Sequence, residues 1–324
     1  MSRLPYLAAT IFAVCILPAG IVCAQNYPHK AIRFIMPYPA GGSIDTTGRI
    51  VAQQLAENFG QQVVIDNRTG AGGTVGTEIG ARAAPDGYTL VMGGTGTLAL
   101  SPNLQRNLPY DPVRDFAPVT LLVIVPYVLV VPAALRVNSV RELIALAKSR
   151  PDQINYGSGG NGSAPHLAAE LFKTMAGVRL VHVPYKGSTP AINDVIAGQV
   201  QLTFTGIPSV LAHIKSGRLR PIGVTSAARA TALPDVPAIR ESGVPGYEVT
   251  PWFGVLVPAR TPPALVTRLN GEIVKVLRSQ AIRERFAAEG VEPVGNTPAQ
   301  FASYIKLERV KWGKVIKDAG IRVD

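Results

Sequence analysis

Apolar and polar residues alternate along this chain with two different periods. Short apolar runs rich in β-branched residues are each followed by a small-residue turn, and then by a segment whose apolar positions have helical spacing. This alternation predicts an α/β protein in which helices connect parallel strands. In the first third of the chain we expect strands at 31–36, 62–65 and 89–92, a helix at 44–58, and a second helix from the turn at 70–73 through residue 83.

The same pattern returns in the middle of the chain, and helical segments close it. Ser139 with Glu142 and Thr297 with Gln300 each form a capping-box pattern at a helix start. We expect strands at 154–156, 180–183, 201–205 and 221–225, helices from 139, at 163–175 and at 190–197, and three C-terminal helices around 265–277, at 281–288 and from 297 to 320.

Two extended apolar segments, 123–131 and 247–257, bracket the middle third of the chain. Each is long enough to cross from one folded unit to another. We therefore predict a discontinuous first lobe, 25–126 with 251–324, and an inserted second lobe, 127–250. Two α/β lobes joined by two crossing strands are suited to closing around a ligand.

Residues 1–24 are typical of a leader and not of a folded segment. Arg3 precedes an uncharged run at 7–22, which ends in the small-residue sequence Val22-Cys23-Ala24. This favours a signal peptide cleaved after Ala24, and hence export to the periplasm. A membrane anchor is the alternative, but the run is shorter than the about 20 apolar residues that a spanning helix needs. No later stretch predicts a transmembrane helix.

Several chemistries lack the residues that they need. Both cysteines, Cys15 and Cys23, lie in the leader, so the mature chain offers no disulfide, thiolate or cysteine-bound metal. The four histidines show no zinc-binding spacing, and no serine lies in G-x-S-x-G. The run 157–162 matches G-x-G-x-x-G, but no carboxylate ends the next strand, which argues against a dinucleotide. We expect no metal, no cofactor and no enzymatic activity.

The formal net charge is +11, and the leader accounts for one positive charge through Arg3. Basic residues are dispersed, and the densest zone, 278–317, alternates with apolar helix positions. Nucleic-acid binding would need clustered basic residues interleaved with exposed aromatic ones. The charge therefore indicates solubility and a general attraction for anions.

One structural device recurs in both predicted lobes: a strand, a turn of small residues, and a helix N-terminus. It occurs at 39–43, 70–73, 93–96, 157–163 and 185–188. Parallel strands bring such turns to one edge of a sheet, where ligands bind. Free N–H groups and the helix dipole make each turn a seat for an anion, contributing roughly 0.3–1 kcal/mol. Glycine also serves turns for backbone shape alone, but several converging turns could hold a carboxylate without arginine.

Three polar side chains near these turns have two interpretations each. Asp45 falls in the first turn of a helix, where capping and ordering of the loop are favoured over catalysis. His166 could donate to a ligand or pack in the core. Lys186 could contact an anion or remain solvated.

Several sequence segments together resemble those of one known family. They are PYPAGGSID (37–45), NYGSGGNGSAPHL (155–167), VPYKGSTPAINDVIAGQV (183–200), PDVPAIRESGVPGYEV (234–249), WFGV (252–255) and VTRLNGEI (266–273). The chain resembles the Bug receptors, the periplasmic solute-binding components of tripartite tricarboxylate transporters, over nearly its whole length. The resemblance implies a two-lobed type II periplasmic binding protein fold and a small organic acid as ligand.

The resemblance also implies which residues bind the ligand. The ligand-binding positions that it implies are Tyr38, Ala40, Gly41, Gly42, Asp45, Gly94 and Thr95 in the first lobe, and Ser158, Gly162, Ser163, His166, Tyr185, Lys186, Gly187 and Thr205 in the second. Many relatives carry an acidic residue where this chain has Thr205. Because a threonine cannot pair with a ligand ammonium group, this difference argues against an amino-acid ligand.

The expected function is capture of a di- or tricarboxylate, or a related organic acid, by a monomeric protein for a membrane carrier. The alternative partner is an extracytoplasmic sensor kinase, which the same surfaces would serve. A secreted enzyme is the third and least favoured possibility.

Overall fold

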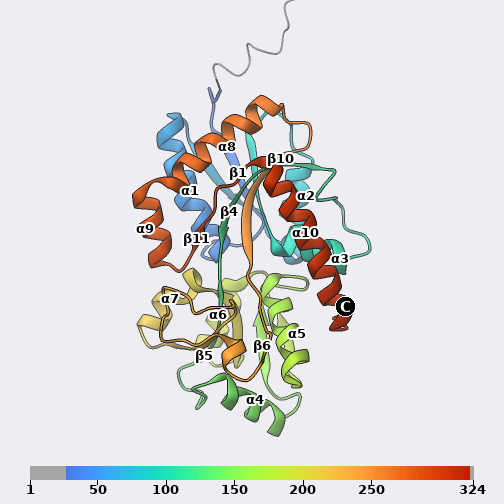
Figure 1. The fold of residues 1–324 in the computed structure, drawn as a ribbon, viewed down its shortest axis with the longest axis vertical. Helices are drawn as coiled ribbons and strands as arrows, with labels where there is room; N and C mark the ends of the chain where they lie inside the picture. The colour runs from blue at the N-terminus through green and yellow to red at the C-terminus, as the bar shows by residue number, and fades with distance from the viewer. Residues whose placement is uncertain (1–26, 322–324) are drawn as a thin grey trace, which may run out of the picture.

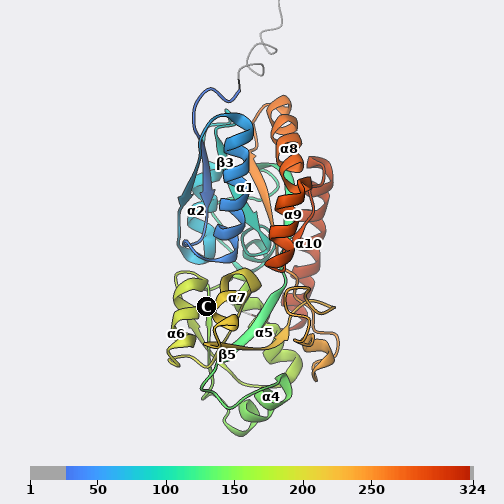
Figure 2. The same ribbon diagram turned by 90° about the vertical axis from the view of Figure 1, so that its left-hand side faces the viewer.

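The computed structural model describes residues 27–321 and arranges them as two α/β lobes stacked along the long axis (Figures 1 and 2). Each lobe has its own sheet, with strand order β11-β4-β10-β3-β1-β2 in the first and β7-β6-β8-β5-β9 in the second. The predicted α/β class is therefore confirmed. The leader, its cleavage site and both cysteines lie outside the described residues.

Helices cover both faces of the first sheet. Its strands are β1 (Ile32–Met36), β2 (Val63–Asn67), β3 (Thr89–Gly94), β4 (Phe116–Ile124), β10 (Trp252–Pro258) and β11 (Glu292–Pro293). The helices of this lobe are α1 (Ser43–Phe59), α2 (Thr74–Ala81), α3 (Ser101–Leu104), α8 (Pro263–Arg278), α9 (Gln280–Ala288) and α10 (Pro298–Asp318), with a 3-10 turn at Ala71–Gly73 and a π-helical turn at Thr95–Leu100.

The second lobe repeats this plan on a smaller scale. Its strands are β5 (Tyr127–Pro132), β6 (Asn155–Ser158), β7 (Val181–Pro184), β8 (Leu202–Gly206) and β9 (Leu219–Val224). Its helices are α4 (Val140–Ser149), α5 (Ala164–Ala176), α6 (Ser188–Ile196) and α7 (Ile207–Lys215), with a short 3-10 turn at Ile239–Glu241.

The parallel strands of each sheet direct their carboxyl ends toward the other lobe. β1 is parallel to β2 and β3, and β6 is parallel to β7 and β8. The turns that follow them meet across the junction: a Cβ on Gly187 would lie 2.1 Å from Pro39 Cγ, and one on Gly72 would lie 2.4 Å from the Asn161 carbonyl oxygen. The glycine turns therefore face each other across one junction and are not splayed onto separate faces.

Two segments cross between the lobes and are hydrogen-bonded to each other. β4 of the first sheet leads into β5 of the second through Val125 and Pro126, and the chain returns to β10 after Pro251. Val125 N–H donates to the Pro251 carbonyl oxygen at 2.8 Å. The expected pair of crossing strands is thus present, whereas the exact lobe boundaries at 126/127 and 250/251 remain a prediction.

Some local expectations differ from the structure. β4 begins at Phe116, well before the predicted start of the crossing segment, and helix α7 was not predicted. Of the two capping boxes, the one at Thr297 and Gln300 is complete. At α4, Ser139 accepts from Glu142 N–H, but the Glu142 carboxylate accepts from Asn138 N–H and does not close the box.

Helix α10 is anchored to crossing strand β10 through a buried carboxylate. Glu308 Oε2 accepts hydrogen bonds from the indole nitrogens of Trp252 and Trp312, both at 2.9 Å. All three side chains are buried, and the apolar cluster that contains both tryptophans continues from one lobe into the other. No helix among the described residues is both long and apolar enough to cross a membrane.

We expect Glu308→Ala to lower the free energy of unfolding by about 3 kcal/mol, because two buried indole donors lose a charged acceptor. Urea denaturation followed by tryptophan fluorescence measures this loss. Lys311→Met removes the partly exposed Lys311–Glu308 pair and the contact of Lys311 Nζ with the Trp312 ring, and should cost about 1 kcal/mol or less. Equal losses in the two variants would contradict the assignment of Glu308 as a buried acceptor.

Candidate functional site

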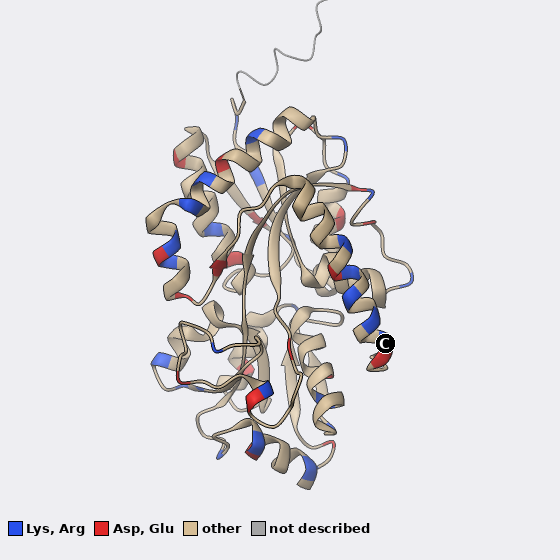
Figure 3. Cartoon of the chain, viewed as in Figure 1, with Lys and Arg blue, Asp and Glu red and all other residues tan. Residues whose placement is uncertain are grey.

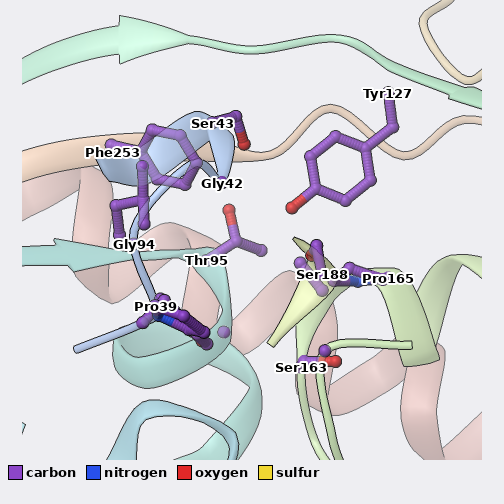
Figure 4. Close-up of a pocket in the computed structure, with 15 residues that line it drawn as sticks. Pro39, Gly42, Ser43, Gly94, Thr95, Tyr127, Ser163, Pro165, Ser188 and Phe253 are labelled. Atoms are coloured by element: carbon purple, nitrogen blue, oxygen red, sulfur yellow. The ribbon is translucent and has the colours of Figure 1, made fainter. Parts of the chain in front are cut away.

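A cavity lies between the two lobes and contains about 490 Å³ of space free of protein atoms, part of it open to solvent (Figure 4). Both lobes contribute to its wall. The lining residues are Tyr38, Pro39, Gly42, Ser43, Ile44, Gly94, Thr95, Gly96 and Phe253 from the first lobe, and Tyr127, Gly159, Ser163, Ala164, Pro165 and Ser188 from the second. A pocket between two lobes is a common location for a ligand site.

The first-lobe wall is the N-terminus of α1. Gly42 is its N-cap, in an extended conformation, and Ser43 and Ile44 begin the helix. N–H groups of the first helical turn have no acceptor within their own helix, and the helix dipole adds positive potential at this end. The turn after β1 therefore presents backbone donors to the cavity.

Asp45 shapes this turn from behind. Its Oδ2 accepts from the Gly41 N–H at 3.0 Å and from Arg49 Nε at 2.9 Å, and its Oδ1 accepts from Asn67 Nδ2. Burial alone would raise the pKa of Asp45, but these hydrogen bonds outweigh burial and hold it below its ordinary value. Asp45 thus orders the loop, and the Gly41 amide is already engaged within the protein.

Thr95 and Tyr38 differ in what their hydroxyl groups can offer. Thr95 Oγ1 accepts from Trp252 N–H at 2.9 Å, which leaves its own hydrogen able to donate toward the cavity. The Tyr38 hydroxyl donates to the Gly72 carbonyl oxygen at 2.7 Å, so Tyr38 acts as a wall. Gly94 adjoins Thr95, and a side chain there would collide with Phe253.

The second-lobe wall is built from two further helix N-termini. Ser163 is the N-cap of α5, and its hydroxyl oxygen accepts from His166 N–H at 3.4 Å. Gly187, with φ 127°, is the N-cap of α6, which starts at Ser188. Thr189 Oγ1 donates to the Ala40 carbonyl oxygen at 3.0 Å and ties this wall to the first lobe.

A buried group of aromatic and histidine rings supports the loop before α5. His166 Nδ1 accepts from Gly162 N–H at 3.2 Å, and Ser158 Oγ lies 2.6 Å from His182 Nε2. The two histidine rings are stacked at 4.1 Å, and the Tyr156 ring lies nearly parallel to both, 4.8 Å from His182 and 6.4 Å from His166. Burial lowers the pKa of both histidines, that of His182 to about 4. His166 thus follows the packing interpretation and does not line the cavity.

Tyr185 and Lys186 line a neighbouring hollow that shares Tyr38, Pro39 and Gly159 with the main cavity. The Tyr185 hydroxyl donates to Asp194 Oδ2 at 2.5 Å, whereas the Lys186 side chain is exposed. Thr205 is buried without a protein partner for its hydroxyl oxygen and stands apart from the residues that line the cavity.

The structure therefore sorts the expected positions into three groups. Those that line the main cavity are Tyr38, Gly42, Gly94, Thr95 and Ser163; those at its neighbour are Tyr38, Tyr185 and Lys186; those outside both linings are Ala40, Gly41, Asp45, Ser158, Gly162, His166, Gly187 and Thr205. Most of the last group shape the turns without facing the space.

Sequence reasoning missed several lining residues, above all Ser43, Ser188, Tyr127 and Phe253. Ser43 and Ser188 directly follow glycine in two of the predicted turns, so that position alone could have suggested them. Tyr127 and Phe253 lie on the crossing strands, and nothing in the strand pattern indicates which side chains face the junction.

No lining residue of the main cavity carries a charge. Lys, Arg, Asp and Glu residues are dispersed along the ribbon of both lobes (Figure 3). Within residues 27–321, no group of three or more His, Cys, Asp or Glu residues is arranged to hold a metal ion.

Two lobes that are joined by two crossing segments, with an uncharged cavity between them at several helix N-termini, form the arrangement of a solute-binding protein of the periplasmic binding type. The chain belongs to the TctC family, described as "Tripartite tricarboxylate transporter family receptor", which matches residues 47–321. The predicted family and two-lobed fold are confirmed. Since the family consists of binding proteins, the expectation of a receptor and not an enzyme is also confirmed.

Individual relatives cover nearly the whole chain. Protein BugT of Bordetella pertussis is 39% identical over 317 residues, which are 97% of each chain. Rpa4515 of R. palustris, solved with adipate, matches with a TM-score of 0.89 and 39% identity over 91% of this chain and 99% of its own. MatC (Rpa3494) from Rhodopseudomonas palustris, with bound malate, matches with a TM-score of 0.85 and 30% identity over 90% of this chain and all of its own.

The buried histidines generate a prediction for pH dependence. The pKa of His182 is about 4 in the folded protein and near the ordinary value of 6.5 in the unfolded chain. Between these pH values the unfolded chain therefore binds more protons than the folded protein. The free energy of unfolding should therefore fall as the pH is lowered from about 6.5 to about 4. Urea denaturation at a series of pH values measures this slope.

His182→Phe should make that slope shallower, because the ring stack is kept and one titrating group is lost. His166 would account for a remaining slope. An unaltered slope in His182→Phe would contradict the role assigned to His182.

Proposed function

We propose that this protein captures a small di- or tricarboxylate, or a related organic acid, in the cavity between its lobes and delivers it to the membrane subunits of a tripartite tricarboxylate transporter. The periplasm is the proposed location, with the signal peptide removed after Ala24. The two lobes, 25–126 with 251–324 and 127–250, would open to admit the acid and close over it.

The observation that carries this proposal is the combination of an uncharged wall with several helix N-termini. An anion buried without a counter-charge needs hydrogen-bond donors to replace its water. The first turns of α1, α5 and α6 meet at the cavity, and each adds positive potential where its donors point. Such a wall suits a carboxylate better than a cation or a neutral apolar solute.

We assign direct contact to a subset of the predicted residues together with new ones. Gly42, Ser43 and Ile44 would offer backbone N–H groups, and Thr95 would donate from its hydroxyl. Ser163 and Ser188 would act from the second lobe. Asp45 and His166 would hold the loops in shape, and Lys186 would attract anions at the neighbouring hollow.

The relatives support both the ligand class and the partner. Two solved relatives hold adipate and malate, which are both dicarboxylates, and both align over nine-tenths of this chain. The family description names a receptor of tripartite tricarboxylate transporters. These findings favour a carboxylate ligand and a transporter partner for the present chain.

A thermal-shift series with the mature protein tests the proposal. Adipate, malate and tricarboxylates are compared with neutral amides of the same length. A carboxylate present at about 100 times its Kd should add about 2.7 kcal/mol, which corresponds to roughly 5 °C at this chain length. The absence of a shift with every carboxylate would contradict the proposed function.

Gly42→Val should abolish that shift. The Gly42 backbone, with φ −75°, accepts any residue, and an added Cβ would meet only the Pro39 carbonyl oxygen at 3.7 Å, so the side chain would occupy the cavity. Gly271→Val makes the same chemical change on the exposed face of α8, where an added Cβ meets nothing within 4 Å. The control should bind the acid normally, and normal binding by Gly42→Val would refute the placement of the site.

A further inference from the structure

Tyr127 carries a hydroxyl that opens on the cavity and makes no hydrogen bond to another described residue. Its side chain is only 5% exposed and lines the cavity. Figure 4 shows its oxygen pointing into the space between Thr95 and Ser188. A hydroxyl that faces a cavity and has no protein partner is available to a water molecule or a bound ligand there.

The surroundings hold this hydroxyl in place. Tyr127 is the first residue of β5, directly after the crossing at Pro126. Its N–H donates to Thr225 Oγ1 at 3.0 Å, and its carbonyl oxygen accepts from Thr225 N–H at 2.8 Å. The N–H and the carbonyl group of Tyr127 are thus both bonded to Thr225. The direction of its ring is therefore set by the crossing segment from which it projects.

Other side-chain donors on this side of the cavity are few. The Thr189 hydroxyl donates to the Ala40 carbonyl oxygen, whereas Ser163 Oγ accepts from His166 N–H and keeps its own hydrogen to donate. Pro165, in the first turn of α5, has no N–H group. Tyr127, Ser163 and Ser188 are thus the lining hydroxyls of the second lobe that can donate to a bound molecule.

Another part of the cavity wall is the N-terminus of α1, which supplies backbone N–H groups. A bound molecule that contacts both would have one end at α1 and another at the Tyr127 hydroxyl. A carboxylate suits the first end, and an oxygen that accepts a hydrogen bond suits the second.

We propose that Tyr127 is a specificity-determining residue whose hydroxyl donates to an oxygen at the far end of the bound acid. The cavity then selects acids with a second oxygen-bearing end, such as dicarboxylates, over monocarboxylates of the same length that end in a methyl group. This inference rests on the proposed function, because it assumes that the cavity binds a carboxylate at α1.

Tyr127→Phe tests the inference, since it removes the hydroxyl and keeps the ring. Calorimetric Kd values are compared for adipate and for hexanoate, which has the same carbon number and a methyl group at its far end. A hydrogen bond to a charged acceptor contributes enough that adipate should bind about tenfold or more weakly to the variant. Hexanoate should change by less than about twofold, so the ratio of the two Kd values is the readout.

The ligand-free melting temperature separates a ligand-binding role from a structural one. Because the hydroxyl has no protein partner, Tyr127→Phe should melt at or above the temperature of the wild type. Tyr304→Phe, on α10 outside the cavity, is the matched control and should leave both Kd values unchanged.

The outcomes distinguish this inference from the proposed function. If the wild-type protein binds neither these two acids nor any other carboxylate, the proposed function fails. Suppose that the wild type binds adipate and that Tyr127→Phe weakens the binding of adipate and of hexanoate equally, or changes neither Kd. The role of Tyr127 is then refuted while the proposed function stands. Tyr127 has a structural role if the variant melts at a lower temperature and loses affinity for both acids equally.

Discussion

The proposed ligand sets the central constraint on this structure, because a carboxylate would be buried in a cavity that has no positive side chain in its wall. Water that leaves a carboxylate must be replaced by donors that are already in position. Backbone N–H groups at helix N-termini meet this need, but each contributes little alone, so several must point at one space. The parallel strands of both sheets end at the junction between the lobes, and this arrangement brings α1, α5 and α6 together.

Much of the polar machinery around the cavity maintains the shape of its turns. Asp45 binds the Gly41 amide and Arg49, and the stacked His166 and His182 hold the loop before α5 through Gly162 and Ser158. A backbone-lined site depends on such support, because an N–H group cannot reorient as a long side chain can. Residues that appear to belong to a binding motif can therefore be necessary for binding without touching the ligand.

Both crossing segments reach the cavity wall. β10 carries Phe253 into that wall, and its neighbour Trp252 is bonded to Thr95 through its backbone and to Glu308 through its indole. The other crossing segment leads into β5, whose first residue is Tyr127. In the proposed function, a ligand that contacts these segments would therefore bear on the relative positions of the two lobes.

The sequence by itself determined the α/β class, the two-lobed plan and the family, because strand and helix periodicity and the glycine turns are local patterns. It also identified Gly42, Thr95 and Ser163 as candidates for the cavity wall. Only the tertiary structure decided which turn residues face the cavity and which lie behind it. From the sequence alone, His166 and Asp45 are candidates for contact with the ligand. In the structure, their hydrogen bonds are to the folded turns around them. Tyr127 and Phe253 carry no local signal, because the facing of a side chain on a crossing strand depends on how the two lobes pack across the junction.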